Sequence, residues 1–314
     1  MKPLFAFLLF CTLCLQPTLA QDDLMSLLDD MEEETTDYTY ATFKTTRLVN
    51  GHSIEMSAPG VLTLIIAHRF GRLNGGFAEL FGLDQANMRF GFEYGVTNWL
   101  NLGVGRSNVR KTYDGYVKAR LLRQSSGKRK FPFSLTALSA MQVNTLPWPD
   151  PTRENFYSSR LSFTHQIMIA RKFNESLSLQ IMPTLVHRNF VASQEEENDV
   201  WSIGAGGRIK LSPSVTLNVE YYYLLPGFTA DNFEDSFSVG FDIETGGHVF
   251  QLIFSNTIAM TENLFIAEST NQWDRGEINF GFNLSRVFTI ADNHNREAKK
   301  AAKKEGKKKK QKKK

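Results

Sequence analysis

A two-residue alternation of apolar and polar side chains recurs along most of this chain. Between residues 87 and 96 the apolar positions are Met88, Phe90, Phe92, Tyr94 and Val96, and the residues between them are polar or glycine. This alternation is typical of a β-strand with one apolar and one polar face. Twelve segments share it, at residues 61–70, 87–96, 99–106, 113–122, 131–143, 156–172, 176–188, 200–211, 215–224, 235–245, 248–256 and 277–289. No segment shows the spacing of a long amphipathic helix, so we predict an all-β fold.

The connections between these segments distinguish a soluble sandwich or propeller from a membrane barrel. Connections after the second, fourth, sixth, eighth and tenth strands are mostly very short, at residues 97–98, 123–130, 173–175, 212–214 and 246–247, and the others are longer. Outer-membrane barrels alternate short periplasmic turns with longer extracellular loops, whereas a sandwich has no reason to do so. We therefore predict a twelve-stranded antiparallel transmembrane β-barrel with both termini in the periplasm.

The two ends of the chain differ from its middle. Residues 1–20 read as a cleaved secretory signal, with Lys2 before an apolar run and Ala20 before the cleavage point, and they contain both cysteines. Residues 21–60 form an acidic N-terminal periplasmic segment and a possible plug, and residues 61–290 form the barrel. Residues 291–314 hold twelve Lys or Arg against three acids, which predicts a disordered basic tail.

Several short motifs resemble an uncharacterised family of Gram-negative outer-membrane β-barrels. They lie at residues 22–34, 41–44 (ATFK), 50–55 (NGHSIE), 67–71 (AHRFG), 79–86 (ELFGLDQA), 111–115 (KTYDG) and 176–183. The resemblance covers about residues 22–290 and implies a barrel in the bacterial outer membrane. The family is classed by an unknown function, so it implies no catalytic or binding residues.

Strand parity predicts which charged side chains face the lumen. The candidates are Arg69, Arg89, Glu93, Lys118, Arg120, Arg160, Arg188, Arg208, Lys210, Glu220, Asp242 and Glu244, and Lys172 shares their face. We expect Arg89 and Glu93 to form a local pair. The pairs Lys118 with Arg120 and Arg208 with Lys210 need an anion or an acid from elsewhere, and these two clusters are the predicted solute-contacting surface. A closed lumen filled by ion networks remains the alternative.

The leading functional hypothesis is a narrow channel or binding lumen for small, anionic solutes. A non-conducting structural barrel that links the outer membrane to periplasmic partners is the alternative, and an outer-membrane hydrolase ranks third. His165 lies on the lipid-facing side without a serine two residues later, so we predict no enzyme, and no catalytic, metal or cofactor site. Expected partners are outer-membrane lipid, the barrel-assembly machinery, and cell wall or anionic lipid at the Lys-rich tail, but not nucleic acid.

Overall fold

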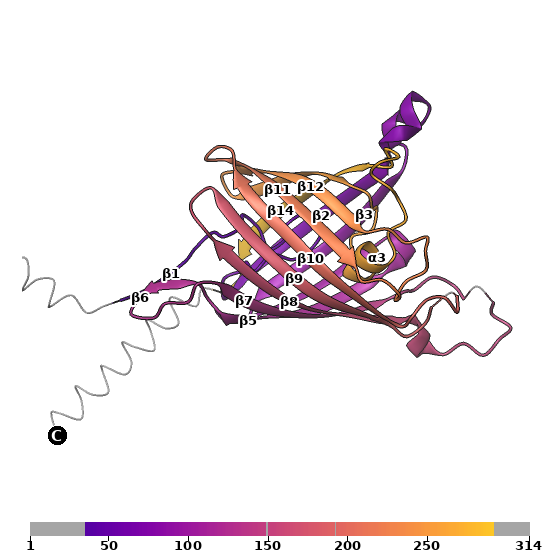
Figure 1. Cartoon of the computed structure of the whole chain (residues 1–314), viewed down its shortest axis with the longest axis horizontal. Coiled ribbons are helices and arrows are strands. Elements are labelled where there is room, and N and C mark those ends of the chain that lie inside the picture. The colour runs from indigo at the N-terminus through magenta and orange to yellow at the C-terminus, as the bar shows by residue number, and fades with distance from the viewer. Residues whose placement is uncertain (1–34, 149, 192, 292–314) are drawn as a thin grey trace, which may run out of the picture.

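A computed structural model describes residues 35–148, 150–191 and 193–291. The predicted signal sequence, most of the acidic stretch before residue 37 and the Lys-rich tail lie outside the described residues. The model confirms an antiparallel barrel of twelve strands that closes on itself (Figure 1). Each strand pairs with its neighbour in sequence, and the last barrel strand pairs with the first.

The strands follow the predicted segments closely. They are β2 (Val61–Arg72), β3 (Ala86–Gly95), β4 (Leu100–Ser107), β5 (Tyr113–Leu122), β7 (Ser134–Val143), β8 (Leu161–Lys172), β9 (Leu177–Arg188), β10 (Asp199–Lys210), β11 (Val215–Leu224), β12 (Ser236–Thr245), β13 (His248–Ser255) and β14 (Asn279–Thr289). Short turns gather at one end of the barrel and longer loops at the other, which we call the turn end and the loop end.

Two predicted strands begin later than expected. The fifth begins at Ser134, after Pro132, which has no backbone N–H to donate to a ladder. The sixth begins at Leu161, because residues 157–160 form the 3-10 turn η3 (Tyr157–Arg160). Arg160 was therefore wrongly placed within a strand. It lies at the loop end, where its guanidinium donates to the carbonyls of Asn144 and Leu146.

The two faces of the wall differ in polarity in the direction that a membrane barrel requires. In β3, Phe90 and Phe92 are 42% and 44% exposed on the outside, whereas Arg89 and Glu93 on the other face are buried at 3% and 0%. An apolar outer face contacts lipid favourably, and closure of the sheet leaves no unpaired edge in the bilayer.

Several smaller elements lie outside the wall. The strands β1 (Thr36–Tyr38) and β6 (Ser125–Gly127) form a separate two-stranded sheet beyond the turn end (Figure 1). The loop end carries η1 (Leu73–Gly82), η2 (Val109–Lys111) and the helix α3 (Glu262–Ala267). None of the helices in the described ranges is long and apolar enough to cross a membrane.

The hydrophobic core lies inside the barrel, where two irregular segments meet the wall. Residues 41–58, which we call the inner segment, lie between β1 and β2, and α3 belongs to the loop between β13 and β14. The buried cluster combines wall residues such as Met168, Met182 and Tyr222 with Phe43, Leu48 and Ile54 of the inner segment and Phe265 of α3. Twelve strands enclose more space than their own side chains fill, so other parts of the chain occupy the remainder.

Candidate functional site

The inner segment enters the lumen from the turn end, reverses, and returns to the same end. Arg47 and His52 form an antiparallel bridge, and the backbone N–H of Leu48 donates to the carbonyl of Gly51 over 2.8 Å. The segment leaves the lumen at Pro59, which bridges Gly95 at the turn end of β3. Between these points none of its residues joins the barrel ladder of the described strands. It therefore occupies the lumen without forming part of the wall.

Glu220 of β11 holds the tip of the inner segment. Its carboxylate accepts the backbone N–H groups of Val49, Asn50 and Gly51 at 3.0–3.3 Å. The Asn50 side chain in turn accepts the guanidinium of Arg69 at 2.7 Å and donates to Ser238 and Ser255. Backbone N–H groups at a reversal have no secondary-structure partner, and a buried carboxylate supplies one.

Lys118 and Arg208, from the two predicted basic clusters, bind the entering and returning arms of the inner segment. The Arg208 guanidinium donates to the carbonyls of Ala41 and Thr42 at 2.8 and 3.0 Å. The Lys118 ammonium donates to the carbonyls of Thr46 and Glu55. Both side chains are almost fully buried. Carbonyl oxygens of the inner segment thus occupy the positions where we expected a bound anion.

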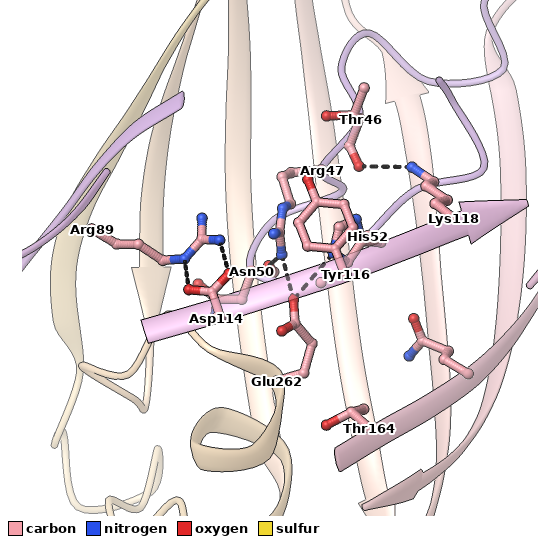
Figure 2. Close-up of polar contacts among 12 residues, drawn as sticks. Thr46, Arg47, Asn50, His52, Arg89, Asp114, Tyr116, Lys118, Thr164 and Glu262 are labelled. Atoms are coloured by element: carbon pink, nitrogen blue, oxygen red, sulfur yellow. Dashed lines mark hydrogen bonds and ion pairs between the residues drawn. The ribbon is translucent and has the colours of Figure 1, made fainter. Parts of the chain in front are cut away.

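Arg47 and Glu262 join the inner segment to α3 inside the lumen (Figure 2). Arg47 Nη1 lies 2.6 Å from Glu262 Oε1, and both side chains are no more than 5% exposed. The Arg47 guanidinium also lies over the Tyr116 ring, 5.7 Å from its centroid. A buried ion pair of this kind contributes little net stability, but removal of one partner leaves a costly unpaired charge. We call this pair the latch.

His52 completes the latch region. Its Nε2 lies 3.2 Å from Glu262 Oε1, and its ring packs edge-on against Tyr116 with centroids 4.6 Å apart. Burial, and then the nearby Arg47 charge, lower the pKa of His52 to about 3, so the imidazole is neutral at physiological pH. The Arg47 guanidinium keeps the pKa of Glu262 well below its ordinary value despite burial. The latch is therefore a single ion pair beside a neutral imidazole.

The expected pair between Arg89 and Glu93 does not form. Arg89 instead makes a buried ion pair with Asp114 on β5, through Nε at 3.0 Å and through Nη2 (Figure 2). Glu93 accepts the Tyr116 hydroxyl at 2.9 Å and the Asn101 amide at 2.7 Å. Register explains the correction, because Asp114 lies opposite Gly105 on β4, whose lack of a side chain leaves room for the Arg89 guanidinium.

The other predicted lumen-facing residues lie at different depths along the barrel. Asp242 is buried and accepts the Gln251 amide at 2.7 Å, and Arg188 pairs with Glu196 at 2.8 Å near the loop end. Arg120 and Lys210 are half-buried at the turn end, where Lys172 donates to the carbonyl of Tyr40. Glu244 is exposed there and pairs with Lys44. The eight fully buried candidates are Arg69, Arg89, Glu93, Lys118, Arg188, Arg208, Glu220 and Asp242.

Three charged residues that sequence reasoning missed change the balance inside the barrel. Asp114 shares the parity of Lys118 and could have been found from it. Arg47 and Glu262 lie outside the strands, where no periodicity points to the lumen. The buried charged side chains of the described chain are six bases, Arg47, Arg69, Arg89, Lys118, Arg188 and Arg208, and five acids, Glu93, Asp114, Glu220, Asp242 and Glu262. In the closed arrangement the lumen is close to neutral.

A cavity of about 400 Å³ opens at the loop end beside α3. Its lining is mixed, with polar side chains that include Arg72, Arg110, Asn256, Glu268 and Asn271, and with the apolar side chains of Val109, Phe233, Ile258, Ala259 and Leu264. Arg110 pairs with Glu268 over 2.6 Å across it. The described residues contain no group of three or more His, Asp or Glu side chains placed to hold a metal ion.

Comparisons with solved structures find barrels of low sequence identity. The NanC porin matches with a TM-score of 0.46 and 7% identity, over 73% of this chain and 100% of that chain. The KdgM porin matches with a TM-score of 0.44 and 8% identity, over 73% of this chain and 99% of that one. An outer membrane channel from Pseudomonas putida F1 matches with a TM-score of 0.45 and 11% identity, over 78% and 100% of the two chains. No curated protein sequence matches the chain.

One family comparison covers most of the chain. Residues 43–288 match the family described as "Membrane bound beta barrel domain (DUF5777)". The match begins inside the inner segment and continues into β14, so it includes the lumenal contacts described above. The chain therefore belongs to this family of membrane-bound β-barrel domains.

Proposed function

We propose that this protein is an outer-membrane channel for small polar solutes that is closed at rest by the inner segment. The observation that carries the proposal is the path of the inner segment. It enters and leaves at the turn end, and no described residue between Ala41 and Ala58 pairs with the wall in the ladder. Removal of the segment from the lumen therefore breaks no strand pairing, and the barrel stays closed as a sheet.

The contacts of the inner segment make the closed state the resting state. Phe43, Leu48 and Ile54 are 3%, 1% and 4% exposed within the internal cluster. Burial of such side chains contributes roughly 1.5–3 kcal/mol each. The remaining contacts are the Arg47–Glu262 ion pair with α3 and hydrogen bonds to side chains of the wall, which water can replace when the segment leaves. Opening therefore needs an input of free energy, but no rearrangement of the barrel.

Release of the inner segment would also set the charge preference of the open lumen. Lys118 and Arg208 would lose the carbonyl oxygens that they bind, and Arg69 would lose the amide oxygen of Asn50. On the acidic side, Glu220 and Glu93 would lose the hydrogen bonds of the inner segment, and Glu262 would lose Arg47. Three bases and three acids would then face water in the lumen, while the bases Arg120, Lys172 and Lys210 outnumber Glu244 at the turn end. Fixed charge in a low-dielectric wall concentrates ions of the opposite sign. We propose small anions as the preferred solutes of the open state.

Single-channel recording of two N-terminal truncations tests the proposal. A chain that begins at Pro59 lacks the inner segment, and a chain that begins at Ala41 keeps it and serves as the matched control. Both are refolded in vitro beside the full mature chain, which begins at Gln21 after the predicted signal sequence. We expect rare openings from the full mature chain and the control, and sustained conductance from the chain that begins at Pro59. If that chain inserts, shows the heat-dependent gel mobility of a closed barrel and still does not conduct, the channel proposal fails.

A non-conducting structural barrel is the second candidate. The apolar anchors favour it, because Leu48 and Ile54 pack against the wall as core residues do. In that case the inner segment is a permanent part of the fold. The chain that begins at Pro59 would then fail to refold or would lose most of its thermal stability, whereas the channel proposal expects it to assemble.

A further inference from the structure

A groove on the outer surface of the barrel lies outside the function proposed above. It has a volume of about 530 Å³ and runs over β5, β7, β8, β9 and β10. Its floor consists of the small residues Ala119 and Ala137, and its rims include Val117, Ile167 and Trp201, which are 45%, 40% and 46% exposed. In a membrane-bound barrel this surface faces lipid. The groove is therefore wide enough and apolar enough to accept a hydrocarbon chain.

One polar pair interrupts this apolar surface. Ser139 of β7 and His165 of β8 are cross-strand partners, and Ser139 Oγ lies 3.1 Å from His165 Nδ1. If the hydroxyl donates to Nδ1, the imidazole keeps an N–H at Nε2. If Nδ1 donates instead, the hydroxyl keeps its hydrogen. Either arrangement leaves one hydrogen to donate toward the groove, and a donor in an apolar setting requires an acceptor.

The position of the pair along the barrel indicates which acceptor fits. His165 pairs with Leu185 on β9, which pairs with Trp201 on β10. Two residues nearer the loop end, His187 forms an exposed ion pair with Asp199 over 2.6 Å. The ion pair therefore lies roughly 7 Å nearer the loop end than Leu185, at about 3.3 Å per residue. Trp201 and the ion pair mark the interface on β9 and β10, whereas β7 and β8 carry the apolar pair Met141 and Phe163 at the same step toward the loop end. Ser139 and His165 therefore lie just on the hydrocarbon side of the headgroup layer.

On the hydrocarbon side of Ser139 and His165, the strand pairing of the wall is interrupted. The ladder between β8 and β9 pairs Gln166 with Thr184 and next Ile169 with Ile181, so it is interrupted at Ile167 and Pro183. Proline has no N–H to donate and disturbs a strand at such a position. Pro183, Ile167 and Ala137 line the groove below the polar pair. A chain that enters between the rims thus lies against a recessed apolar surface.

We propose that this groove binds one ester-linked acyl chain of a membrane lipid. The acyl carbonyl accepts the hydrogen presented by Ser139 and His165, and the hydrocarbon lies over Ala137 and Pro183. A lipid acyl carbonyl has lone pairs and no hydrogen, occurs at this depth, and continues into an apolar chain. It therefore matches the single donor and the apolar recess together.

Native mass spectrometry of the mature chain tests the site with two probes. One is palmitoyl-oleoyl phosphatidylethanolamine, and the other is its diether analogue, which lacks both carbonyls. We expect the wild type to retain the ester lipid about fivefold more than the diether, as for one net hydrogen bond. The double variant Ser139→Ala with His165→Leu should bring this ratio to about one. Ala137→Leu fills the recess and should reduce retention of both lipids.

Ala205→Leu is the matched control, because Ala205 is an exposed alanine on the same face of β10 that does not line the groove. It should leave both retentions unchanged. Equal retention of ester and diether by the wild type would overturn the proposal. So would release of free fatty acid from the ester probe, which would make the pair a hydrolytic site. A wild-type dimer that Ala137→Leu dissociates would instead assign the groove to a second copy of this chain.

Discussion

The barrel wall and the inner segment each take part in a buried ion pair between an arginine and an acid, but the two pairs have different structural settings. In the wall, the Arg89–Asp114 ion pair joins two strands whose backbones are already linked through β4. In the lumen, the Arg47–Glu262 ion pair joins two segments that have no ladder between them. Loss of the first pair therefore acts on the fold, whereas loss of the second acts on the position of the inner segment. If the channel proposal is right, the same kind of buried ion pair stabilises the wall in one region and keeps the lumen closed in the other.

Loss of the Arg47–Glu262 ion pair should change the open probability more than any other substitution. Glu262→Gln leaves the Arg47 charge buried without its partner, a cost of about 3–5 kcal/mol. The inner segment can avoid that cost by leaving the lumen, so we expect the ratio of open to closed states to rise by about 10²-fold to about 4 × 10³-fold. Single-channel recording measures the ratio, and the unfolding temperature should change little.

Asp114→Asn is the counterpart in the wall. Both Arg89 and Asp114 belong to strands, so the uncompensated charge cannot leave without disturbing the barrel. We expect a lower unfolding temperature in a gel-mobility assay and little change in open probability. If the two variants have the same effects, the distinction between wall and inner segment is wrong.

A steric change at the contact between the regions should have the next largest effect. A Cβ at Gly206 would lie 2.2 Å from Leu48 Cδ2, so Gly206→Val pushes against the inner segment. Overpacking of this kind costs about 1–3 kcal/mol, enough to raise the open probability up to about 100-fold. Gly115→Val is the control, since the nearest atom to its Cβ is 3.8 Å away. Conductance that rises equally in both variants would contradict this contact.

Acidification should break the latch only at low pH. The pKa of Glu262 is lowered by Arg47, so the latch is fully present above the ordinary carboxyl value of 4.5 and is lost as the pH falls through the lower folded value. His52 adds no transition near its ordinary pKa of 6.5, because its own pKa is about 3. Recordings between pH 8 and pH 3 should show opening well below 4.5 in the wild type. A transition near pH 6.5 would show that His52 titrates in the closed state.

The smallest effect concerns charge preference. Replacement of Lys118 and Arg208 by Gln should leave the reversal potential of the rare wild-type openings nearly unchanged if the segment leaves only in part. In the chain that begins at Pro59, the same substitutions should shift the reversal potential in a salt gradient toward cation preference by a few millivolts to tens of millivolts. No shift in the truncated chain would show that these bases do not face the solute path.

The sequence allowed the wall to be predicted almost completely, because a two-residue period specifies both a strand and its inward face. Residues such as Arg69, Lys118 and Glu220 were placed on the inner face by parity alone. Partners across the lumen could not be predicted, because they depend on register and on segments without a period. Arg47 and Glu262 are 215 residues apart in the chain and gave no local signal. Residues 50–51, an Asn-Gly pair, were a visible indication of a reversal inside residues 21–60.

The channel proposal requires that the inner segment leave the lumen when the barrel conducts. Leu48→Cys in a chain that begins at Gln21 tests this, because Leu48 is 1% exposed and residues 21–314 contain no cysteine. A charged, membrane-impermeant thiol reagent is added during bilayer recording. We predict slow labelling of the single variant Leu48→Cys. In the double variant that also carries Glu262→Gln, labelling should be faster by orders of magnitude, and conductance should be sustained after labelling. Equal labelling rates in both backgrounds, or rapid labelling without any change in conductance, would contradict the account.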